Sequence, residues 1–384
     1  MPVSSPAVFA RQILCASGLT LASIVTACGP SNRGASDSAV AMRDDSTAAG
    51  NSSPDSASGR TRSLQPSSEQ QGVLDALGSL GGKPIETLTA IEARQQPSPT
   101  DAVMAVLKKN GESIAPETVG SVVNRTIPST GGALPVRIYT PAGAGPFPVI
   151  VYYHGGGWVI ATNDTYDGSA RALTNAVNAV LVSVEYRKAP EYKFPAAHDD
   201  AFAAYEWVIK NAGSLKGDPS RIALAGESAG GNLAIATAMT ARDGDMPVPL
   251  HILAVYPIAG IDTTTDSYTQ NAAAKPLSRP MMNWFFNMYA PTPKARQDPR
   301  INLLGANLKG LPPVTIISAE MDPLRTEGEQ LAVRLSQAGV QVEQRTFPGT
   351  AHEFFGQGAV VPQAKEAVKY GATGIKDAFQ KKNR

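Results

Sequence analysis

One serine in this sequence is flanked by glycines in a pattern that suits nucleophilic chemistry. Ser228 lies in LAGESAGGN (residues 224–232), with Gly226 two residues before it and Gly230 two residues after it. The strand-like run RIALAGE precedes it and the helical run AGGNLAIATAMTA follows. A serine at a tight strand-to-helix turn exposes its hydroxyl, and glycines two residues away leave room where strand and helix nearly touch. Gly-rich turns also occur in nucleotide-binding folds, so other residues must decide.

A second glycine-rich stretch could supply hydrogen-bond donors to a reacting oxygen. The run YYHGGGW (residues 152–158) ends another strand-like segment. Backbone N–H groups in such a loop or at a helix N-terminus stabilise the oxyanion of acyl transfer, and losing one donor typically costs about 3–4 kcal/mol. A simple glycine turn is the alternative, but three consecutive glycines between His and Trp favour a functional role.

A serine nucleophile needs a base and an acid that orients the base, and in this kind of fold they follow in the order Ser, acid, His. Two histidines follow the serine. His251 opens the strand-like run HILAVYP, whereas His352 lies in FPGTAHEFF, a loop after a predicted strand, where a base would be presented. For the acid we favour Asp322 in SAEMDPLRTEG over Glu320, because Glu320 can still belong to the preceding strand. For either acid, a helix cap or a salt bridge is the alternative role.

The elements that must position these residues alternate along the chain. Helical segments separate most of six apolar runs rich in Val and Ile: PVIVYYH, AVLVSVEY, RIALAGE, HILAVYP, PPVTIISAE and VQVEQRTFP. Such runs are typical of buried parallel strands. The alternation predicts a doubly wound α/β domain with its ligand site at the carboxyl ends of the strands. Two earlier runs, SVVNRTIP and LPVRIYTP, predict an antiparallel pair.

Helices are also expected outside this alternation. Helical spacing in SEQQGVLDALGSLGG, TLTAIEARQ and PTDAVMAVLKKN predicts short helices ahead of the sheet. Residues 261–310 form an insertion between two strands and contain the amphipathic aromatic stretch SRPMMNWFFNMYA. We expect the insertion to cover the strand ends, the alternative being an ordinary packing helix.

Together these pieces resemble the bacterial hormone-sensitive-lipase-like carboxylesterases, the family IV lipolytic enzymes of the α/β-hydrolase superfamily. The motifs HGGGWV, VEYRKAPEYKFPAAHDD, GESAGGNLA, DPLRTEG and HEFF occur in the family's order, and the likeness covers roughly residues 70–380. The resemblance implies an α/β-hydrolase fold with a mostly parallel, doubly wound sheet and a helical cap. The catalytic domain would span 69–384, with its cap drawn from about 69–118 and 261–310.

The resemblance also implies the residues of the site and their roles. Ser228 would be the nucleophile, His352 the base and Asp322 the residue that orients it. The oxyanion hole would consist of three backbone N–H groups, those of Gly156, Gly157 and Ala229. His154 would be structural, and neither a metal nor a cofactor would be required.

Two positions depart from the commonest pattern of the family. Glu227 stands where an Asp usually precedes the nucleophile, and Glu353 stands where a Gly usually follows the catalytic histidine. A carboxylate at position 353 could raise the pKa of the imidazole or narrow the pocket. It therefore bears on the substrate range and the pH optimum rather than on the mechanism.

The expected function is a serine carboxylesterase that hydrolyses a small-molecule ester through an acyl-enzyme. The bulky side chains of WVI and MMNWFFNMY, together with the family likeness, favour short- to medium-chain esters. An amidase or a deacetylase on the same triad is the alternative. A non-catalytic binding protein on the hydrolase scaffold, as in the gibberellin receptor, is disfavoured by the presence of His352.

Composition excludes several other classes of protein. The 384 residues include 34 basic and 33 acidic side chains, a net charge of +1, without a long basic run. Nothing therefore indicates a nucleic-acid partner. The two cysteines, Cys15 and Cys28, lie near the N-terminus, and the four histidines are scattered. We expect neither a disulfide framework, a thiol nucleophile nor a metal cluster in the body of the chain.

The N-terminus has a different character. In residues 1–27 a single Arg11 precedes the apolar stretch ILCASGLTLASIVTA, which predicts a secretory signal segment. Residues 28–68 are dense in Ser, Ala, Gly and Asp, which predicts a disordered tether.

The stretch VTAC resembles the bacterial lipobox, in which the cysteine, here Cys28, becomes the first mature residue and carries lipid. An ordinary signal cleavage site is the alternative, and a disulfide with Cys15 is a weaker one. Because Gly29 rather than Asp follows, we expect an exported outer-membrane lipoprotein in a Gram-negative cell. The lipid would be its only membrane contact, and the sequence predicts no oligomeric state.

Overall fold

The computed structural model of the chain describes residues 64–382. The predicted signal segment, Cys28 and most of the predicted tether lie outside these residues. Among the helices that are described, none is both long and apolar enough to cross a membrane.

The first described residues already belong to the folded domain. Helix α1 (Ser68–Ser79) begins one residue before the predicted domain boundary, and the hydroxyl of Ser67 accepts a hydrogen bond from the amide of Gln70 as its N-cap. The amide of Ser67 also donates to the carbonyl of Gly349 at 2.9 Å. The last residues of the predicted tether are therefore held in place by the domain.

An eight-stranded sheet forms the centre of the domain. Its strands are β1 (Ser121–Ser129), β2 (Gly132–Thr140), β3 (Phe147–Tyr153), β4 (Val180–Val184), β5 (Gly217–Glu227), β6 (Ile252–Val255), β7 (Val314–Met321) and β8 (Val342–Ala351). They lie in the order β1-β2-β4-β3-β5-β6-β7-β8. β2 pairs antiparallel with both β1 and β4, and every other neighbouring pair is parallel. Every predicted strand forms, which confirms the mostly parallel α/β prediction.

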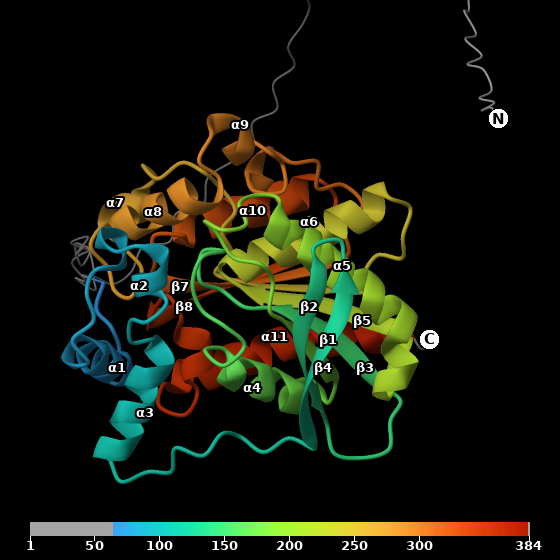
Figure 1. Cartoon of the computed structure of the whole chain (residues 1–384), viewed down its shortest axis with the longest axis horizontal. Helices are drawn as coiled ribbons and strands as arrows, with labels where there is room; N and C mark the ends of the chain where they lie inside the picture. The colour runs from blue at the N-terminus through green and yellow to red at the C-terminus, as the bar shows by residue number, and fades with distance from the viewer. Residues whose placement is uncertain (1–63, 383–384) are drawn as a thin grey trace, which may run out of the picture. The chain divides into compact units, whose positions relative to one another are not determined.

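Helices cover both faces of the sheet (Figure 1). Helices α4 (Asp167–Val177) and α11 (Pro362–Lys381) lie on one face, and α5 (Ala196–Asn211), α6 (Ala229–Asp243) and α10 (Arg325–Gln337) lie on the other. Alternate side chains of β3 enter the two resulting cores: Val149 and Val151 pack with the α5 and α6 side, Ile150 and Tyr152 with the α4 and α11 side. Burial on both faces is why these strands are apolar throughout instead of alternating with polar residues.

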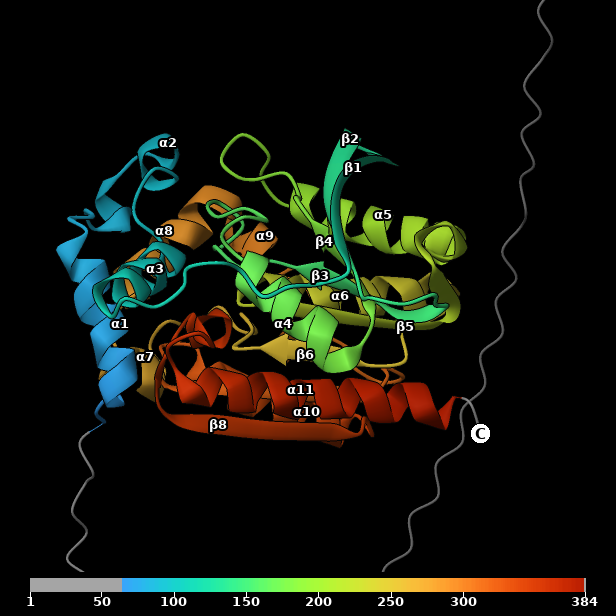
Figure 2. The same ribbon diagram turned by 90° about the horizontal axis from the view of Figure 1, so that it is seen from below.

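Two groups of short helices lie side by side at one end of the sheet in both views (Figures 1 and 2). The first group comprises α1, η1 (Ile85–Thr87), α2 (Ala90–Ala93) and α3 (Pro99–Lys109). The second comes from the insertion and comprises α7 (Asp266–Gln270), α8 (Arg279–Tyr289), α9 (Pro293–Arg296) and η3 (Leu303–Gly305). The remaining short helices are η2 (Ala212–Leu215) and η4 (Phe354–Gln357). TLTAIEARQ forms only the single turn of α2, and Ser98 then caps the next helix, which begins at Pro99.

Side chains tie the first group of helices to its surroundings. The indole N–H of Trp284 in α8 donates to the carbonyl of Leu88 at 3.1 Å. Arg94, which ends α2, donates to the carbonyls of Val159 and Ala189 and pairs with Glu191 at 2.7 Å. These contacts connect the segment before the sheet both to the insertion and to the loop after β3.

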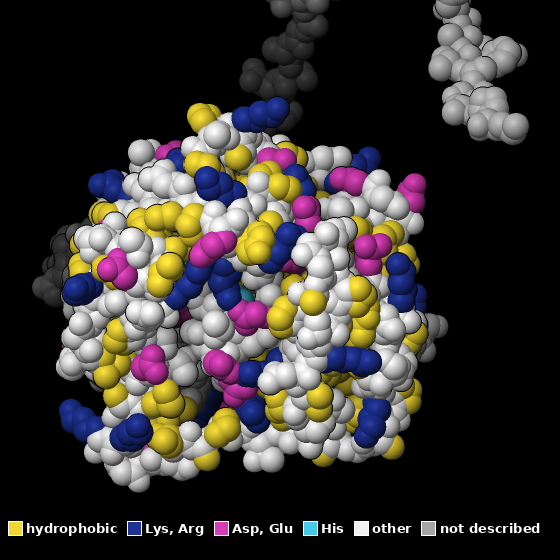
Figure 3. All heavy atoms as spheres, viewed as in Figure 1, with side chains coloured by type: hydrophobic (Ala, Val, Ile, Leu, Met, Phe, Trp, Pro, Cys, Tyr) yellow, Lys and Arg dark blue, Asp and Glu magenta, His cyan; other side chains and the backbone are white. Residues whose placement is uncertain are grey.

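Charge is evenly distributed on the face of the domain shown in Figure 3. Lys and Arg side chains are interspersed there with Asp and Glu. The pattern agrees with the near-zero net charge of the sequence.

Candidate active site

Ser228 lies at the turn between β5 and α6, as its sequence context predicts. Its backbone has φ 56° and ψ −117°, a strained conformation for a residue with a side chain. A Cβ added at Gly226 would lie 2.2 Å from the carbonyl oxygen of Gly230, and a Cβ at Gly230 would lie 1.9 Å from that of Tyr153. Any larger residue at either position would clash with the backbone, so this turn requires glycine at both.

The ends of β7 and β8 bring the other two predicted residues to this serine. His352 Nε2 lies 3.0 Å from Ser228 Oγ, and His352 Nδ1 lies 2.7 Å from Asp322 Oδ2. Asp322 is fully buried, and its Oδ1 accepts a hydrogen bond from the amide of Leu324 at 2.9 Å. The three side chains form one continuous hydrogen-bonded chain.

The alternatives considered from sequence lie elsewhere. Glu320 belongs to β7, and its Oε2 accepts a hydrogen bond from the amide of Gly349 at 2.8 Å. His251 immediately precedes β6 and its Nε2 lies 3.0 Å from Thr315 Oγ1. His154 is buried and stacks on Tyr186 at a centroid distance of 4.4 Å, which fits a structural role.

Two of the three predicted oxyanion donors line the cavity of Ser228, and the third directly follows that serine in the chain. Gly156 and Gly157 have φ of 96° and 58° and line the same cavity as Ser228. A Cβ at Gly157 would lie 2.2 Å from the ring of Phe285. Ala229 is the first residue of α6, so its amide has no acceptor within that helix. The arrangement can direct backbone N–H groups at an oxygen that develops negative charge.

A cavity of about 280 Å³ opens onto Ser228 and His352. Both groups of short helices contribute to its wall, so the two segments expected to form a cap both meet the site. Its large aliphatic and aromatic lining side chains include Leu74, Leu77, Ile85, Ile160, Leu277, Met281 and Phe285. Phe285 and Met281 come from the aromatic helix α8 of the insertion.

Opposing effects set the basicity of His352. Burial alone would lower the pKa of its imidazole, but the charge and hydrogen bond of Asp322 outweigh burial and raise it. Glu353 and Glu227 add smaller contributions in the same direction. The imidazolium form is therefore stabilised at this position, as a base that must accept a proton requires.

Glu227, which precedes the nucleophile, lies buried beneath the site. Its carboxylate accepts hydrogen bonds from the hydroxyls of Tyr152 and Tyr256. Burial, together with the charge of Glu353, raises its pKa to about 7. Tyr256 in turn packs against the imidazole of His352 at a centroid distance of 4.5 Å. Glu227 thus supports the histidine from below through an aromatic side chain.

Glu353 follows the histidine and reaches back toward it. Its Oε1 lies 3.8 Å from His352 Nε2, and Tyr166 Oη donates to its two carboxylate oxygens at 2.6 and 2.7 Å. Burial raises the pKa of Glu353, while the neighbouring His352 opposes that rise. The side chain lines the cavity and contributes to the raised pKa of the imidazole, the two effects considered from sequence.

Tyr166 was not singled out by sequence. It lies in TNDTYDGSA, which carries no recognisable motif, and it is the N-cap residue of α4. A Cβ added at Gly155 would lie only 2.2 Å from the hydroxyl oxygen of Tyr166, so glycine at position 155 leaves the space that this hydroxyl needs. Only the folded chain brings Gly155, Tyr166 and Glu353 together.

The described part of the chain contains no cluster of side chains that could bind a metal ion. No group of three or more His, Cys, Asp or Glu side chains within residues 64–382 is arranged to hold an ion.

The chain is similar in sequence to known hydrolases. Residues 150–356 match the family described as alpha/beta hydrolase fold. The chain is 42% identical to "Carboxylesterase NlhH" of Mycobacterium tuberculosis over 64% of this chain and 79% of the relative. It is 32% identical to "Ethyl acetate hydrolase" of Pseudomonas putida over 76% of this chain and 92% of the relative.

Solved structures of esterases also superpose on this chain. A hyperthermophilic esterase from the archaeon Pyrobaculum calidifontis superposes with a TM-score of 0.72 at 35% identity, covering 79% of this chain and 96% of that one. A thermostable esterase from Pseudomonas putida superposes with a TM-score of 0.74 at 34% identity, covering 82% of this chain and 98% of that one.

Proposed function

Because this chain belongs to the hormone-sensitive-lipase-like carboxylesterases of the α/β-hydrolase superfamily, we propose that it hydrolyses short- to medium-chain esters through an acyl-enzyme on Ser228. It is a carboxylic ester hydrolase of the serine type. The observation that carries the proposed mechanism is the hydrogen-bonded chain from Ser228 Oγ through His352 to Asp322, with distances of 3.0 and 2.7 Å.

The reaction runs in two halves. Ser228 Oγ attacks the ester carbonyl while His352 Nε2 takes its proton, and the amides of Gly156, Gly157 and Ala229 stabilise the oxyanion. His352 then passes the proton to the departing alcohol, which leaves the acyl group on the serine. Water deprotonated by His352 attacks the acyl-enzyme and releases the acid.

Asp322 acts on the histidine rather than on the ester. Its carboxylate, 2.7 Å from His352 Nδ1, keeps the proton on Nδ1 so that Nε2 faces the serine as an acceptor. The same carboxylate stabilises the imidazolium that forms in both halves. The pKa of His352 is raised because Asp322 stabilises its protonated form.

The preferred acyl length follows from the size of the cavity. About 280 Å³ is available, and bulky side chains from α8 and the loop after β3 line it. Such a space suits short and medium acyl chains better than the long chains of fats. Efficient hydrolysis of emulsified long-chain triglycerides would contradict this part of the proposal.

The experiment measures kcat and KM with p-nitrophenyl esters of increasing acyl length. Wild-type protein should turn over the acetate and butyrate, and S228A should lose activity on the order of 10⁶-fold in kcat, as serine removal does in a comparable triad. A fluorophosphonate probe should label Ser228 in wild type and not in S228A. The exposed Ser214 offers the control S214A, which should behave as wild type. Retained turnover by S228A would contradict the mechanism.

An amidase or deacetylase activity would use the same machinery. Matched p-nitroanilides and p-nitrophenyl esters of one acyl group separate the possibilities. We expect the ester to be hydrolysed by far the faster, because its alcohol leaves more readily than an amine. A faster anilide reaction would favour the amidase.

We also propose that the chain is anchored to a membrane by lipid on Cys28, in the outer membrane of a Gram-negative cell. The support is the sequence VTAC after a short apolar stretch, followed by Gly29. Wild type should take up a fatty-acid analogue and fractionate with membranes, whereas C28A should do neither. Wild type that remains unlabelled and soluble would leave an ordinary secreted protein.

A further inference from the structure

Glu353 is a charged residue of the cavity to which the reaction assigns no step. Its backbone has φ 68°, in the left-handed region that favours glycine and that other side chains adopt at a cost in free energy. Strain of this kind persists where the surrounding structure enforces it, and it gathers at functional sites. The strained backbone directs a carboxylate into the cavity beside His352.

The position of this carboxylate relates it to one part of the ester. His352 Nε2 delivers the proton to the departing alcohol, so the alcohol oxygen must lie within hydrogen-bond distance of Nε2. Glu353 Oε1 is 3.8 Å from that same nitrogen. The carboxylate is therefore a neighbour of the leaving alcohol.

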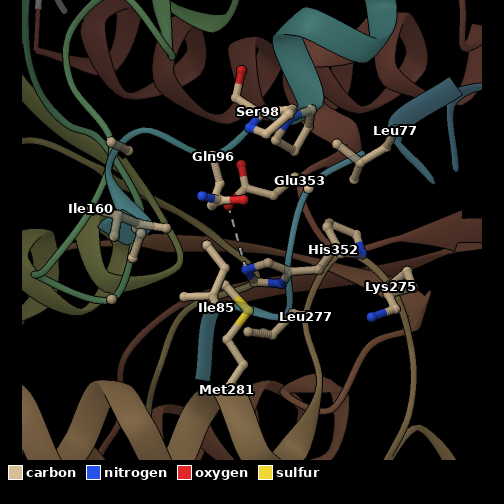
Figure 4. Close-up of a pocket in the computed structure, with 18 of the residues that line it drawn as sticks. Leu77, Ile85, Gln96, Ser98, Ile160, Lys275, Leu277, Met281, His352 and Glu353 are labelled. Atoms are coloured by element: carbon tan, nitrogen blue, oxygen red, sulfur yellow. Dashed lines mark ion pairs between the residues drawn. The ribbon is translucent and has the colours of Figure 1, made fainter. Parts of the chain in front are cut away.

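The cavity differs on the two sides of His352. In Figure 4, Ser98, Gln96 and Glu353 lie on one side of the imidazole. On the other side lie Ile85, Leu277 and Met281. Lys275 lies at the edge of the second side and Leu77 lies beyond Ser98. The second side, with its three apolar side chains, suits a hydrocarbon chain, whereas the first offers most of the oxygen and nitrogen atoms.

Most polar atoms on the first side are already engaged. Gln96 accepts from the amide of Lys83 at 2.8 Å and donates to the carbonyl of Glu92 at 3.0 Å. Ser98 caps α3. Glu353 receives a single hydrogen, from the hydroxyl of Tyr166, although a carboxylate has about four acceptor positions. It retains the capacity to accept from a ligand.

The charges around the cavity decide between two kinds of donor. Lys83, Arg94 and Lys275 contribute positive charge to the wall, against the carboxylates of Glu86 and Glu353. Arg94 is already paired with Glu191, so a cationic leaving group would be repelled chiefly by Lys83 and Lys275. A neutral hydroxyl would avoid that repulsion and still donate to Glu353.

From this geometry we infer that Glu353 forms a leaving-group subsite that accepts a hydrogen bond from a hydroxyl on the carbon next to the ester-bearing carbon. The substrates it selects are monoesters of vicinal diols, such as partial esters of glycols, glycerol or sugars. The inference rests on the proposed esterase function. Tyr166 holds the carboxylate in the orientation that the subsite requires.

The experiment compares 2-hydroxyethyl butyrate with propyl butyrate, which differ by a hydroxyl in place of a methyl group. Acid release is followed by titration, and the quantity of interest is the ratio of their kcat/KM values. E353G removes the carboxylate at a backbone conformation that glycine adopts freely, and should lower the ratio about ten-fold, the lower range for a hydrogen bond to a charged group. E353Q keeps an acceptor oxygen and should retain most of the ratio.

Two controls isolate the effect. E86Q removes a different carboxylate of the cavity wall and should leave the ratio at its wild-type value. 2-(Dimethylamino)ethyl butyrate tests a cationic donor. If it is the preferred ester and the preference disappears in E353Q, the subsite binds cations and the hydroxyl assignment is wrong.

The result that overturns the inference is an equal ratio in wild type and E353G. The rate with p-nitrophenyl butyrate separates this failure from that of the esterase proposal. Turnover of the aryl ester with an unchanged ratio would remove the subsite alone, whereas absence of turnover by wild type with every ester would remove the proposed function.

Discussion

Two turns at the carboxyl ends of neighbouring parallel strands each bring a carboxylate to His352. The turn after β7 carries Asp322, which lies 2.7 Å from Nδ1 and is fully buried. The turn after β8 carries Glu353, which lies 3.8 Å from Nε2 and lines the cavity. Its carboxylate accepts a hydrogen bond from the hydroxyl of Tyr166. One imidazole thus has two acidic neighbours on opposite edges.

The difference shows what makes a carboxylate part of the catalytic machinery. Asp322 has both oxygens occupied by fixed partners, Leu324 and His352, so it can only orient and stabilise the imidazole. Glu353 faces the space where the substrate must lie and keeps free acceptor positions. The first position should control whether the reaction occurs, and the second which ester is preferred and at which pH.

The largest expected effect separates the acid of the triad from its neighbour in sequence. D322N should lower kcat on the order of 10⁴-fold, because an amide at this position favours the wrong imidazole tautomer. E320Q should have a far smaller effect, since Glu320 bonds to the backbone of Gly349 and not to the histidine. Steady-state kinetics with p-nitrophenyl butyrate provide the measurement. A larger loss in E320Q than in D322N would mean that the acid has been misassigned.

The contrast between the two turns also marks how far sequence could reach. The strands and the convergence of Ser228, Asp322 and His352 were predictable, because parallel strands end at one edge of the sheet and each residue directly follows a strand. For Glu353 the sequence indicated an influence on the imidazole pKa or on the pocket, but not where its carboxylate lies, because the direction of the side chain depends on φ 68° and on a hydrogen bond from Tyr166.

The packing around the site shows the same limit. Trp284 meets Leu88 and Arg94 meets Glu191 across long stretches of chain, and no local periodicity encodes those contacts. Burial patterns specify which residues enter a core, but the partners of an irregular segment depend on the whole fold. The contact of Ser67 with Gly349, next to the predicted start of the domain, is of this kind.

A smaller effect concerns the strain stored in the second turn. In a Y166F background, where the hydrogen bond to the carboxylate is already lost, E353G should raise the free energy of unfolding by about 1 kcal/mol, because glycine adopts a left-handed φ without steric cost. Urea unfolding of Y166F and of the double variant measures the difference. Replacing Glu353 with alanine in the same background keeps the strain and should bring no such gain. Equal stability of all three proteins would show that the turn is unstrained.

The smallest effect is on the pH profile. His352 must be neutral to accept the proton of Ser228, so kcat/KM should fall as the pH drops through the pKa of its imidazole. Asp322 does most to raise that pKa against the effect of burial, and Glu353 and Glu227 contribute further. E353Q removes one of these negative charges, which destabilises the imidazolium, lowers the pKa and moves the acid limb of the profile to lower pH.

The shift should be modest, because Asp322 stays in place and the pKa of Glu353 is itself raised by burial, so that Glu353 carries less than its full charge near the acid limb. E320Q, whose carboxylate does not act on the histidine, should leave the limb in place. An acid limb that does not move in E353Q would mean that the carboxylate of the second turn exerts no field on the imidazole. A limb that moves to higher pH would mean that Glu353 does not stabilise the imidazolium.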